Sequence, residues 1–406
     1  MLGLGLLGRG LNDAKFFAEC GAELTITDLK TKEQLEPTLK KLAKYKNIKY
    51  VLGEHRLEDF RNRDFVLKAA GVPLDSIYIK EAKKNNIKVE MDESLFVKCA
   101  PNVKVIGVTG TRGKTTTTYL IYEILKLAFP KKVHLGGNIK GLATLPFLKK
   151  VKNGDIVVME LSSWQLQGWG EAKICPNISV FTNLMDDHLN YYKGSVEKYF
   201  NDKAKIYTNQ NKLDYLICGE KISKKIGKVK SQKIIAKKNN VPKSWKVKLK
   251  GDHNLENISY AIKVAEILGV QEKIIKKAIE NFSGVEGRQE FLREYKGVKI
   301  YNDTTATTPD ATIAALKAFA CGGSTSAGKK CVLIMGGADK NLDMSGLIKE
   351  VPKYCKKVIL LAGTGTEKLG GKVDGILAKS LKEGLLEALK WVKKGDILLL
   401  SPGFAS

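Results

Sequence analysis

The sequence has few of the features that mark secreted, membrane-spanning or zinc-binding proteins. It contains no apolar stretch of about 18 residues, the length that crosses a bilayer, so we expect no transmembrane helix. The start, Met1–Gly10, lacks the charged segment and cleavage site of a signal peptide and reads as structure. The seven cysteines include no C-x-x-C pair. We therefore expect reduced core thiols in a cytoplasmic protein, not a disulfide framework or a zinc site.

Arginine is scarce as well, and the positive charge of the chain comes from lysine. Seven of the 69 Lys and Arg residues are arginines, so 62 lysines dominate the formal net charge of +26. The densest run, Lys221–Lys250, has twelve lysines and no Asp or Glu. Such charge suits nucleic-acid phosphates, but base readout favours arginine, and these lysines alternate with Ile, Val and Trp245 as on the wet side of half-buried strands. We expect a solvated face that attracts anionic substrates, not a nucleic-acid partner.

Length and patterning indicate two or three domains of the α/β class. Short apolar strands alternate with helical patterns, and no internal repeat is present, so we predict βαβ units with mostly parallel sheets. The predicted strands are Glu23–Thr27, Phe65–Ala69, Lys88–Glu90, Val103–Thr109, Asp155–Glu160, Ile178–Thr182, Lys299–Tyr301, Lys330–Met335, Val358–Ala362 and Ile397–Leu400. The predicted helices are Asp13–Cys20, Leu255–Leu268 and Gln271–Glu280. The expected domains are residues 1–99, 100–285 and 286–406.

Both ends of the chain read as cut. The glycine loop at Gly3 should follow a strand, yet only Met1 and Leu2 precede it. At the other end, the strand Ile397–Leu400 leads into a loop that stops at Ser406. We therefore expect a truncated C-terminal domain and slow turnover, which an extended C-terminus would restore.

The strongest local signal is the glycine loop Gly107-Val-Thr-Gly-Thr-Arg-Gly-Lys-Thr-Thr116. It follows an apolar strand and precedes a helix, so backbone N–H groups and the helix dipole can bind phosphate. Lys114 would reach the β- and γ-phosphates of ATP, and the Thr115 hydroxyl would bind magnesium. Because Val108 replaces the first glycine of G-x-x-x-x-G-K-[ST], the pattern is the shorter G-x-x-G-K-T-T. The other loop residues expected to bind ATP are Gly110, Thr111, Arg112, Gly113 and Thr116.

A second glycine loop opens the chain. Gly3-Leu-Gly-Leu-Leu-Gly8, with Asp28 twenty residues on, matches a dinucleotide fingerprint. It would bind NAD, another nucleotide, or nothing if the glycines serve packing alone. The ATP loop downstream argues against a dehydrogenase, because hydride transfer needs no ATP.

Acidic and imidazole groups follow two predicted strands of the middle region. Glu160 ends one strand and Asp186-Asp-His188 follows the next, at the sheet edge where ligands gather. These side chains are candidate magnesium ligands, and the alternative for His188 is a hydrogen-bonded structural residue. In His253-Asn-Leu-Glu-Asn257, Asn254 fits a helix cap, and the motif alternatively offers an amide to adenine.

These motifs together resemble the Mur ligase family. The segment Glu160-Leu-Ser-Ser-Trp-Gln-Leu166 is similar to that of the branch that adds D-glutamate, and the resemblance covers essentially the whole chain. The other matching motifs, in family order, are Gly137-Asn-Ile139, Asp187-His188, His253–Asn257, Asn302-Asp303, Gly336-Gly337 with Lys340, and Ser401-Pro402.

The resemblance implies a monomeric three-domain ligase that uses ATP and Mg²⁺ to join D-glutamate to UDP-N-acetylmuramoyl-L-alanine. The N-terminal and C-terminal domains would be Rossmann-like, and the central domain would be a P-loop ATPase. Lys114, Glu160, His188 and a carbamylated Lys203 would form the catalytic centre, with Thr115, Glu160, His188 and Lys203 at the metals. Leu6, Leu7 and Asp28 would lie near UDP, and Asn138 and Ser162 near the acyl group. Asn257, Arg288 and Asp303 would bind ATP, and Thr307, Lys340 and Ser401 would bind D-glutamate.

Two departures from the family pattern are visible. Thr305 stands where the family usually has lysine, which removes a positive charge, and Gln289 stands in a variable segment beside Arg288. The rival interpretations are a sister ligase of the same superfamily, such as a folylpolyglutamate-type enzyme, and a basic binding protein on a degenerate ligase scaffold.

Overall fold

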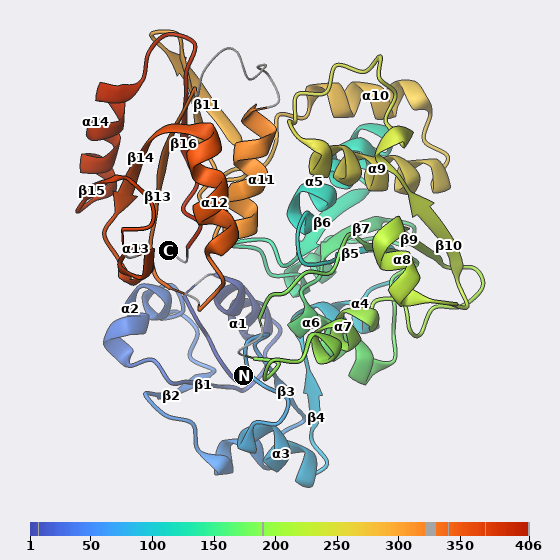
Figure 1. Cartoon of the computed structure of the whole chain (residues 1–406). Helices are drawn as coiled ribbons and strands as arrows, with labels where there is room; N and C mark the ends of the chain where they lie inside the picture. The colour runs from blue at the N-terminus through green and yellow to red at the C-terminus, as the bar shows by residue number, and fades with distance from the viewer. Residues whose placement is uncertain (7, 189–190, 321–329, 340, 370, 405–406) are drawn as a thin grey trace. The chain divides into compact units, whose positions relative to one another are not determined.

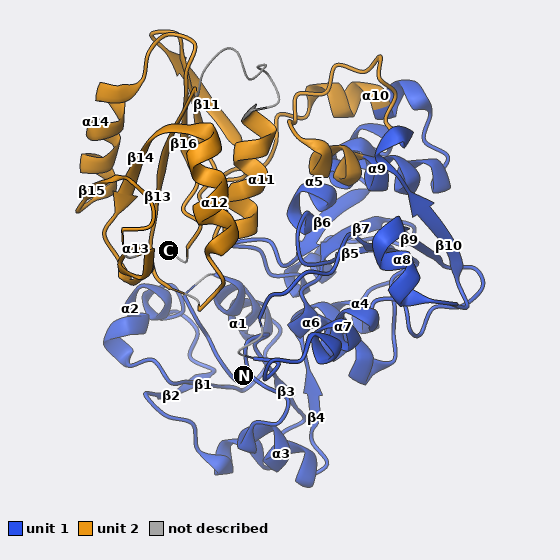
Figure 2. Ribbon diagram, in the orientation of Figure 1, with its two compact units in different colours: residues 1–240, 259–275 blue, residues 241–258, 276–406 orange. Residues whose placement is uncertain are grey.

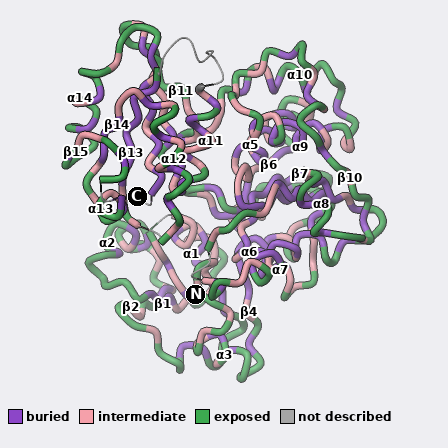
Figure 3. The backbone as a smooth tube through the Cα atoms, in the orientation of Figure 1, coloured by how far each residue is buried: buried purple, intermediate pink, exposed green. Residues whose placement is uncertain are grey.

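The computed structural model describes residues 1–6, 8–188, 191–320, 330–339, 341–369 and 371–404. The chain divides into two compact units (Figure 2). Unit 1 comprises residues 1–240 and 259–275, and unit 2 comprises residues 241–258 and 276–406. Within the described ranges, no helix is both long and apolar enough to span a membrane. In each unit the buried residues follow the strands of the sheets (Figure 3).

The first hundred residues of unit 1 form a small parallel βα layer (Figure 1). Its elements are α1 (Arg9–Glu19), β1 (Leu24–Asp28), α2 (Lys32–Lys40), β2 (Ile48–Leu52), η1 (Leu57–Phe60), β3 (Phe65–Leu67), α3 (Ile77–Lys84), β4 (Lys88–Glu90) and α4 (Asp92–Cys99). β1 pairs with β2 and β3 pairs with β4, and Leu2 forms parallel bridges to both Thr27 and Lys68. Leu2 therefore pairs as a strand residue directly before the first glycine loop, where the sequence had left room for only two residues.

The rest of unit 1 is built on a six-stranded parallel sheet of order β10-β9-β8-β5-β7-β6. Its elements are β5 (Lys104–Thr109), α5 (Lys114–Ala128), β6 (Val133–Gly137), η2 (Leu145–Lys149), β7 (Ile156–Glu160), α6 (Ser163–Ala172), β8 (Ile178–Phe181), α7 (Val196–Ala204), β9 (Tyr215–Gly219), α8 (Glu220–Ile226), β10 (Gln232–Ala236) and η3 (Lys238–Asn240). α9 (Asp252–Ile267) and α10 (Glu272–Asn281) each include residues of both units. β7 is buried along its whole length, as expected for a parallel strand with both faces covered.

Successive side chains of the central strands point alternately to the two faces of this sheet, so each face has its own part of the hydrophobic core. Val105, Val157 and Met159 pack in one cluster with Trp169 of α6 and Phe200 of α7. The intervening residues on β5 and β7 point to the opposite face, because successive strand side chains alternate. We call the glycine loop between β5 and α5, residues 110–113, the phosphate loop. Helix α5, which follows this loop, contacts β5, β6 and β7. The loop is thereby fixed to the centre of the sheet.

Unit 2 contains a second six-stranded sheet, of order β11-β12-β16-β13-β14-β15, in which β11 alone is antiparallel to its neighbour. Its elements are β11 (Glu290–Tyr295), β12 (Val298–Asn302), α11 (Pro309–Ala320), β13 (Cys331–Gly336), α12 (Ser345–Tyr354), β14 (Cys355–Leu361), α13 (Thr364–Leu369), β15 (Ile376–Ala378), α14 (Leu381–Trp391) and β16 (Ile397–Leu400). Leu333 and Leu399 pack with Leu347 of α12, and Val332 and Leu398 pack with Ala388 of α14. The predicted α/β class with mostly parallel sheets is confirmed.

Two sequence-based expectations need correction. The lysine-rich run forms a strand only at β10, because its first part lies in α8, where Ile222 and Ile226, one helical turn apart, are buried. Its twelve lysines are all exposed, as a solvated face requires. The cysteines are not all core thiols either, since Cys20 and Cys99 are exposed at the ends of α1 and α4.

Candidate active site

The phosphate loop between β5 and α5 needs glycine at two positions. Gly113 caps α5 with a left-handed φ of 81°, and Gly110 has a φ of 145°. A Cβ atom on Gly110 would lie 1.9 Å from Thr182 Oγ1. Side chains at either position would therefore disturb the loop, which explains the spacing of the glycines in the sequence.

Residues after β8 hold this loop in place. Thr182 Oγ1 donates a hydrogen bond to the Arg112 carbonyl at 2.6 Å, and the Arg112 N–H donates to Asn183 Oδ1 at 2.9 Å. Thr111 Oγ1 accepts from the Met185 N–H at 2.9 Å. The loop is thus held in one conformation by the residues that follow the neighbouring strand β8.

The side-chain nitrogens of two lysines converge on one carbonyl of the loop. Lys114 Nζ lies 3.0 Å from the Gly110 oxygen, and Lys203 Nζ lies 2.8 Å from the same atom. Lys203 is 1% exposed, and burial, followed by the charge of Lys114, lowers its pKa well below the usual value. The site therefore favours an anion near Lys114 and a neutral amine at Lys203.

The structure brings Glu160, Thr115 and Asn138 together at the carboxyl end of β7. Thr115 Oγ1 donates to Glu160 Oε2 at 2.6 Å, and Asn138 Nδ2 donates to Glu160 Oε1 at 3.2 Å. Glu160 is 3% exposed, so its carboxylate is held inside the protein by these polar partners.

These residues fit a magnesium ion that also binds phosphate. Mg²⁺ usually takes one or two protein carboxylates and fills its other positions with water and phosphate oxygens. Glu160 and the Thr115 hydroxyl supply such a partial set, side by side. Over the described ranges, no group of three or more His, Cys, Asp or Glu side chains is arranged to hold a metal by itself.

His188 lies against aromatic rings near the loop. Its backbone is left-handed, with a φ of 54°, and its ring centroid lies 4.8 Å from that of Trp164 and 6.0 Å from that of Tyr199. The His188 N–H donates to Asp187 Oδ1, while Arg112 Nη1 donates to Asp187 Oδ2 at 2.9 Å. Burial would raise the pKa of Asp187, but the His188 and Arg112 charges outweigh it and hold that pKa low. Asp187 is thus an ionised anchor for both residues.

In the first glycine loop, Asp28 shapes the backbone. Its carboxylate accepts from the N–H groups of Leu4, Gly5 and Lys30 at 2.8–2.9 Å. Burial opposes ionisation, but these hydrogen bonds outweigh it and lower the pKa of Asp28. Leu6 is 52% exposed beside this loop, and Leu7 lies outside the described residues.

Ser162 caps helix α6. Its hydroxyl accepts from the Gln165 N–H at 3.3 Å, and its backbone N–H donates to Gln165 Oε1 at 2.8 Å. This reciprocal capping box orients Ser162 at the helix N-terminus.

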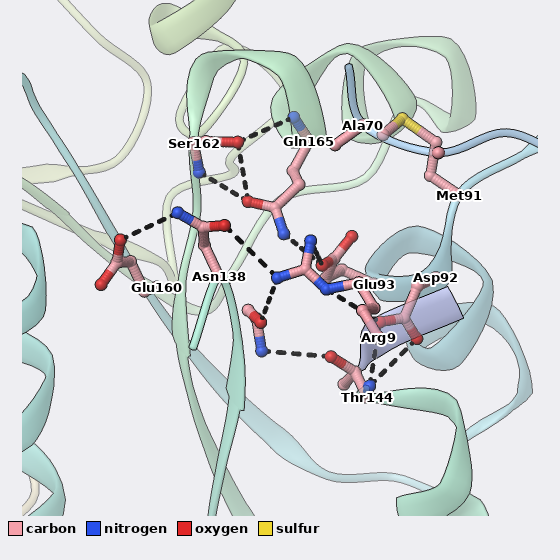
Figure 4. Close-up of polar contacts among 12 residues, drawn as sticks. Arg9, Ala70, Met91, Asp92, Glu93, Asn138, Thr144, Glu160, Ser162 and Gln165 are labelled. Carbon is pink, nitrogen blue, oxygen red and sulfur yellow. Dashed lines mark hydrogen bonds and ion pairs between the residues drawn. The ribbon is translucent and has the colours of Figure 1, made fainter. Parts of the chain in front are cut away.

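Sequence reasoning missed Arg9, the first residue of α1. Figure 4 shows its guanidinium between Asn138 and the acidic pair Asp92 and Glu93. The only sequence signal was its position directly after the Gly3–Gly8 loop, which does not reveal a partner 129 residues away.

The remaining predicted residues belong to unit 2. Ser401 Oγ donates to Asp303 Oδ2 at 2.8 Å, so these two are brought together, and burial raises the pKa of Asp303 to about 6. The Gln289 N–H donates to Asp303 Oδ1 at 3.0 Å, which places the Arg288–Gln289 turn beside the same carboxyl. Thr307 follows Thr305, whose hydroxyl donates to the Gly287 carbonyl at 2.7 Å, and Lys340 lies outside the described residues.

Asn257 lies inside α9 rather than at its start. Asn257 Nδ2 donates to Asn254 Oδ1 at 3.1 Å, and Asn254 Nδ2 donates to the Lys250 carbonyl at 2.8 Å. Because α9 begins at Asp252, the interpretation of Asn254 as its N-cap is wrong.

A buried carboxyl beneath Arg9 makes stability depend on pH. Asp13 is 3% exposed, and burial together with the charges of Asp92 and Glu93 raises its pKa well above the usual value. The folded state therefore loses stability as pH rises from about 4 through that raised pKa, because the unfolded chain ionises more readily. Asp13→Asn should increase the free energy of unfolding at pH 8 by roughly 1–2 kcal/mol, with a smaller gain at pH 5.5.

Urea unfolding at the two pH values measures this effect. The exposed Asp64 provides the matched control, since Asp64→Asn should leave the pH dependence unchanged. This expectation would be contradicted if Asp13→Asn had a lower free energy of unfolding at pH 8 and the same change of that free energy with pH as wild type, because the Asp13 carboxyl would then be ionised and stabilising.

A parallel sheet that brings a glycine loop, a lysine and a hydroxyl to a buried carboxylate defines a nucleotide-binding protein of the P-loop class. Models of known families narrow the class. The Mur ligase middle domain matches residues 108–240, and the Mur ligase, glutamate ligase domain matches residues 287–404. The chain belongs to the Mur ligase family.

Relatives match over the whole length of the chain. UDP-N-acetylmuramoylalanine--D-glutamate ligase from Roseiflexus sp. is 34% identical, with 100% of this chain and 93% of the relative covered. The proteins of the same name from Borreliella afzelii and Clostridioides difficile are 34% and 32% identical, covering 100% and 99% of this chain and 92% and 93% of the relatives.

Solved structures share the fold. UDP-N-acetylmuramate-alanine ligase MurC from Thermotoga maritima has a TM-score of 0.62 at 20% identity, covering 100% of this chain and 95% of that one. MurF ligase from Thermotoga maritima, in complex with ADP, has a TM-score of 0.61 at 20% identity, covering 86% and 92%.

Proposed function

We propose that this chain is an ATP-dependent ligase that adds D-glutamate to UDP-N-acetylmuramoyl-L-alanine, a cytoplasmic step of peptidoglycan precursor synthesis performed by a monomer. The observation that carries the proposal is the convergence of Lys114, Thr115 and Glu160 at the phosphate loop. The full-length similarity to ligases named for D-glutamate supports the choice of amino acid.

The reaction has two steps. The terminal carboxylate of the UDP-linked substrate attacks the γ-phosphorus of ATP, the bond to the bridging oxygen breaks, and an acyl phosphate and ADP form. The neutral amino group of D-glutamate then attacks the acyl carbon. Phosphate leaves as the amide bond forms, and the amine loses its proton.

Lys114 is the principal electrostatic residue of the first step. Its ammonium now donates to the Gly110 and Thr111 carbonyls, and a γ-phosphate would provide a stronger, charged acceptor. Magnesium, held by the Thr115 hydroxyl, Glu160 and His188, would neutralise phosphate charge when bound. The rest of the loop, Gly110–Thr116, would supply N–H donors.

Lys203 would serve as a carbamate. A neutral amine can take up carbon dioxide, and the product is an anionic oxygen ligand in place of a cation. Burial of Lys203 beside Lys114 favours that exchange, because burial keeps the amine neutral and the carbamate would place an anion beside the Lys114 ammonium.

The other assignments extend the same proposal across three domains, residues 1–99, 100–285 and 286–406. Leu6, Leu7 and Asp28 would lie at the UDP site, with Asp28 acting by shaping the loop. Asn138, Ser162 and His188 would position the acyl group. Asn257, Arg288 and Asp303 would contact ATP, and Thr307, Lys340 and Ser401 would bind D-glutamate.

Coupled measurement of ADP formation tests the proposal. ADP should form only when UDP-N-acetylmuramoyl-L-alanine and D-glutamate are both present. L-Lysine, meso-diaminopimelate and L-glutamate, offered in place of D-glutamate, should give little ADP. A preference for any of these would assign the chain to a sister activity. Salt-sensitive binding of DNA or RNA without ADP formation would instead favour a basic binding protein.

A further inference from the structure

Arg9 connects the first glycine loop to the catalytic end of β7. It directly follows Gly8 and opens α1, and its side chain is 25% exposed. Arg9 Nη2 donates to the Gly137 carbonyl at 2.9 Å and to Asn138 Oδ1 at 3.3 Å. One nitrogen of the guanidinium therefore contacts both the backbone and the side chain of the Gly137–Asn138 turn.

This contact determines which way the Asn138 amide points. With Oδ1 accepting from Arg9, Nδ2 is directed toward Glu160 and donates to Oε1 at 3.2 Å. The opposite carboxylate oxygen of Glu160 accepts from Thr115 at 2.6 Å. A continuous chain of hydrogen bonds thus runs from α1 to the first turn of α5.

The guanidinium is itself held by buried acids (Figure 4). Arg9 Nη1 lies 3.6 Å from Glu93 Oε1, and Arg9 Nε lies 4.0 Å from Asp92 Oδ2. Asp92 accepts hydrogen bonds from the Thr144 and Leu145 N–H groups, which fix its carboxylate. The buried carboxylates of Asp92 and Glu93 therefore fix the guanidinium of Arg9 on one side, and on its other side the guanidinium contacts the Asn138 amide, which can rotate.

We propose that Arg9 is a positioning residue that orients the Asn138 amide and, through it, the metal-binding carboxylate of Glu160. The inference rests on the proposed function for the identity of the reaction, but not for the binding of Mg²⁺–ADP. Residues that orient a metal ligand from behind typically change affinity or activity by about 10–100-fold when they are removed.

An arginine is needed here because its planar fork presents several donors in fixed directions. A lysine at this position would keep the positive charge near Asp92 and Glu93, but a single ammonium on a flexible stem would not contact the Gly137–Asn138 turn and these two acids at the same time, as Nη2 and the Nη1–Nε side of the guanidinium do. The substitution Arg9→Lys therefore keeps the positive charge and removes only the fixed directions of the hydrogen-bond donors. It also avoids leaving three carboxyls, those of Asp13, Asp92 and Glu93, without a cation.

A double-mutant cycle on the full-length chain tests the inference. We would measure the dissociation constant of Mg²⁺–ADP by calorimetry for wild type, Arg9→Lys, Asn138→Ala and the double variant. Each single change should weaken binding about 10-fold, and the double variant should be at most about 2-fold weaker than either single variant. The same pattern should appear in kcat for ADP formation.

The control is Arg61→Ala, which breaks a surface ion pair with Glu81 and should leave binding unchanged. Thermal unfolding of each variant excludes misfolding as the cause of lost affinity. The role of Arg9 would be overturned if Arg9→Lys bound Mg²⁺–ADP as tightly as wild type does. It would also be overturned if the loss of affinity in the double variant equalled the product of the losses in the two single variants. A wild-type chain that binds Mg²⁺–ADP but makes no ADP with the two substrates would overturn the proposed function alone, and the binding cycle would still decide the role of Arg9.

Discussion

Replacing Lys114 with methionine should lower kcat for ADP formation by about 1,000-fold or more, because it removes the cation closest to the transferring phosphate. Lys114 Nζ donates to the loop carbonyls of Gly110 and Thr111, so its charge lies at the glycine loop that is proposed to bind the phosphates. Methionine keeps most of the length and apolar volume of the side chain but none of the charge. The free energy of unfolding should therefore change little compared with the catalytic effect.

The matched control lies on the same helix. Lys126 is exposed near the end of α5, where its ammonium lies 5.3 Å from the centroid of the Tyr122 ring. Lys126→Met should leave kcat within about twofold of wild type, as is usual for an exposed substitution with small energetic effect. A kcat of Lys114→Met similar to that of wild type would show that Lys114 takes no part in phosphoryl transfer.

Local motifs predicted the centre of the site because parallel strands bring their carboxyl ends to one edge. β5 and β7 are neighbours in the sheet, so the loop after Thr109 and the carboxylate of Glu160 had to meet. The strand pattern sufficed to locate both, and Thr115 is the second residue of the helix that follows the glycines. Contacts between Thr115 and Glu160 agree with this reasoning.

Positions that depend on distant packing could not be predicted. Arg9 and Asn138 meet because α1 packs beside the turn after β6, and no local pattern in either segment specifies that approach. Asp28 illustrates a related limit. Its spacing indicated a place near a nucleotide but did not reveal that its carboxylate accepts from backbone N–H groups of the loop itself. The fingerprint reflects the shape of the loop as much as the identity of any ligand.

The lysine-rich run illustrates how composition obscures periodicity. Frequent lysines separated by single apolar residues suggested strands, but the burial of Ile222 and Ile226 follows the spacing of a helix. β10 then forms the edge of the sheet, where one side is open to water and lysine is well tolerated.

Lys203→Met should abolish turnover, with a loss of about 100-fold or more, while leaving the fold intact or more stable. The reason is that the Lys203 amine is buried beside Lys114, where an ammonium ion is disfavoured, and that under the proposed function this neutral amine carries the metal-binding carbamate. Methionine replaces a buried neutral amine by an apolar group of similar length, so the core is not destabilised, but the substitution removes the proposed oxygen ligand. Chemical unfolding and kcat for ADP formation measure the two effects on the same samples.

Carbon dioxide provides the second test, because only a carbamate needs it. Wild-type activity should fall in buffer depleted of carbon dioxide and return when bicarbonate is added, whereas Lys203→Met should respond to neither change. Lys198 is exposed on the same helix α7, and Lys198→Met should behave as wild type does. If Lys203→Met kept its activity, the lysine would be a buried structural cation whose amine takes no part in binding the metal. If instead the wild type ignored carbon dioxide while Lys203→Met lost activity, the amine itself would be the functional group, acting as a neutral donor to the loop.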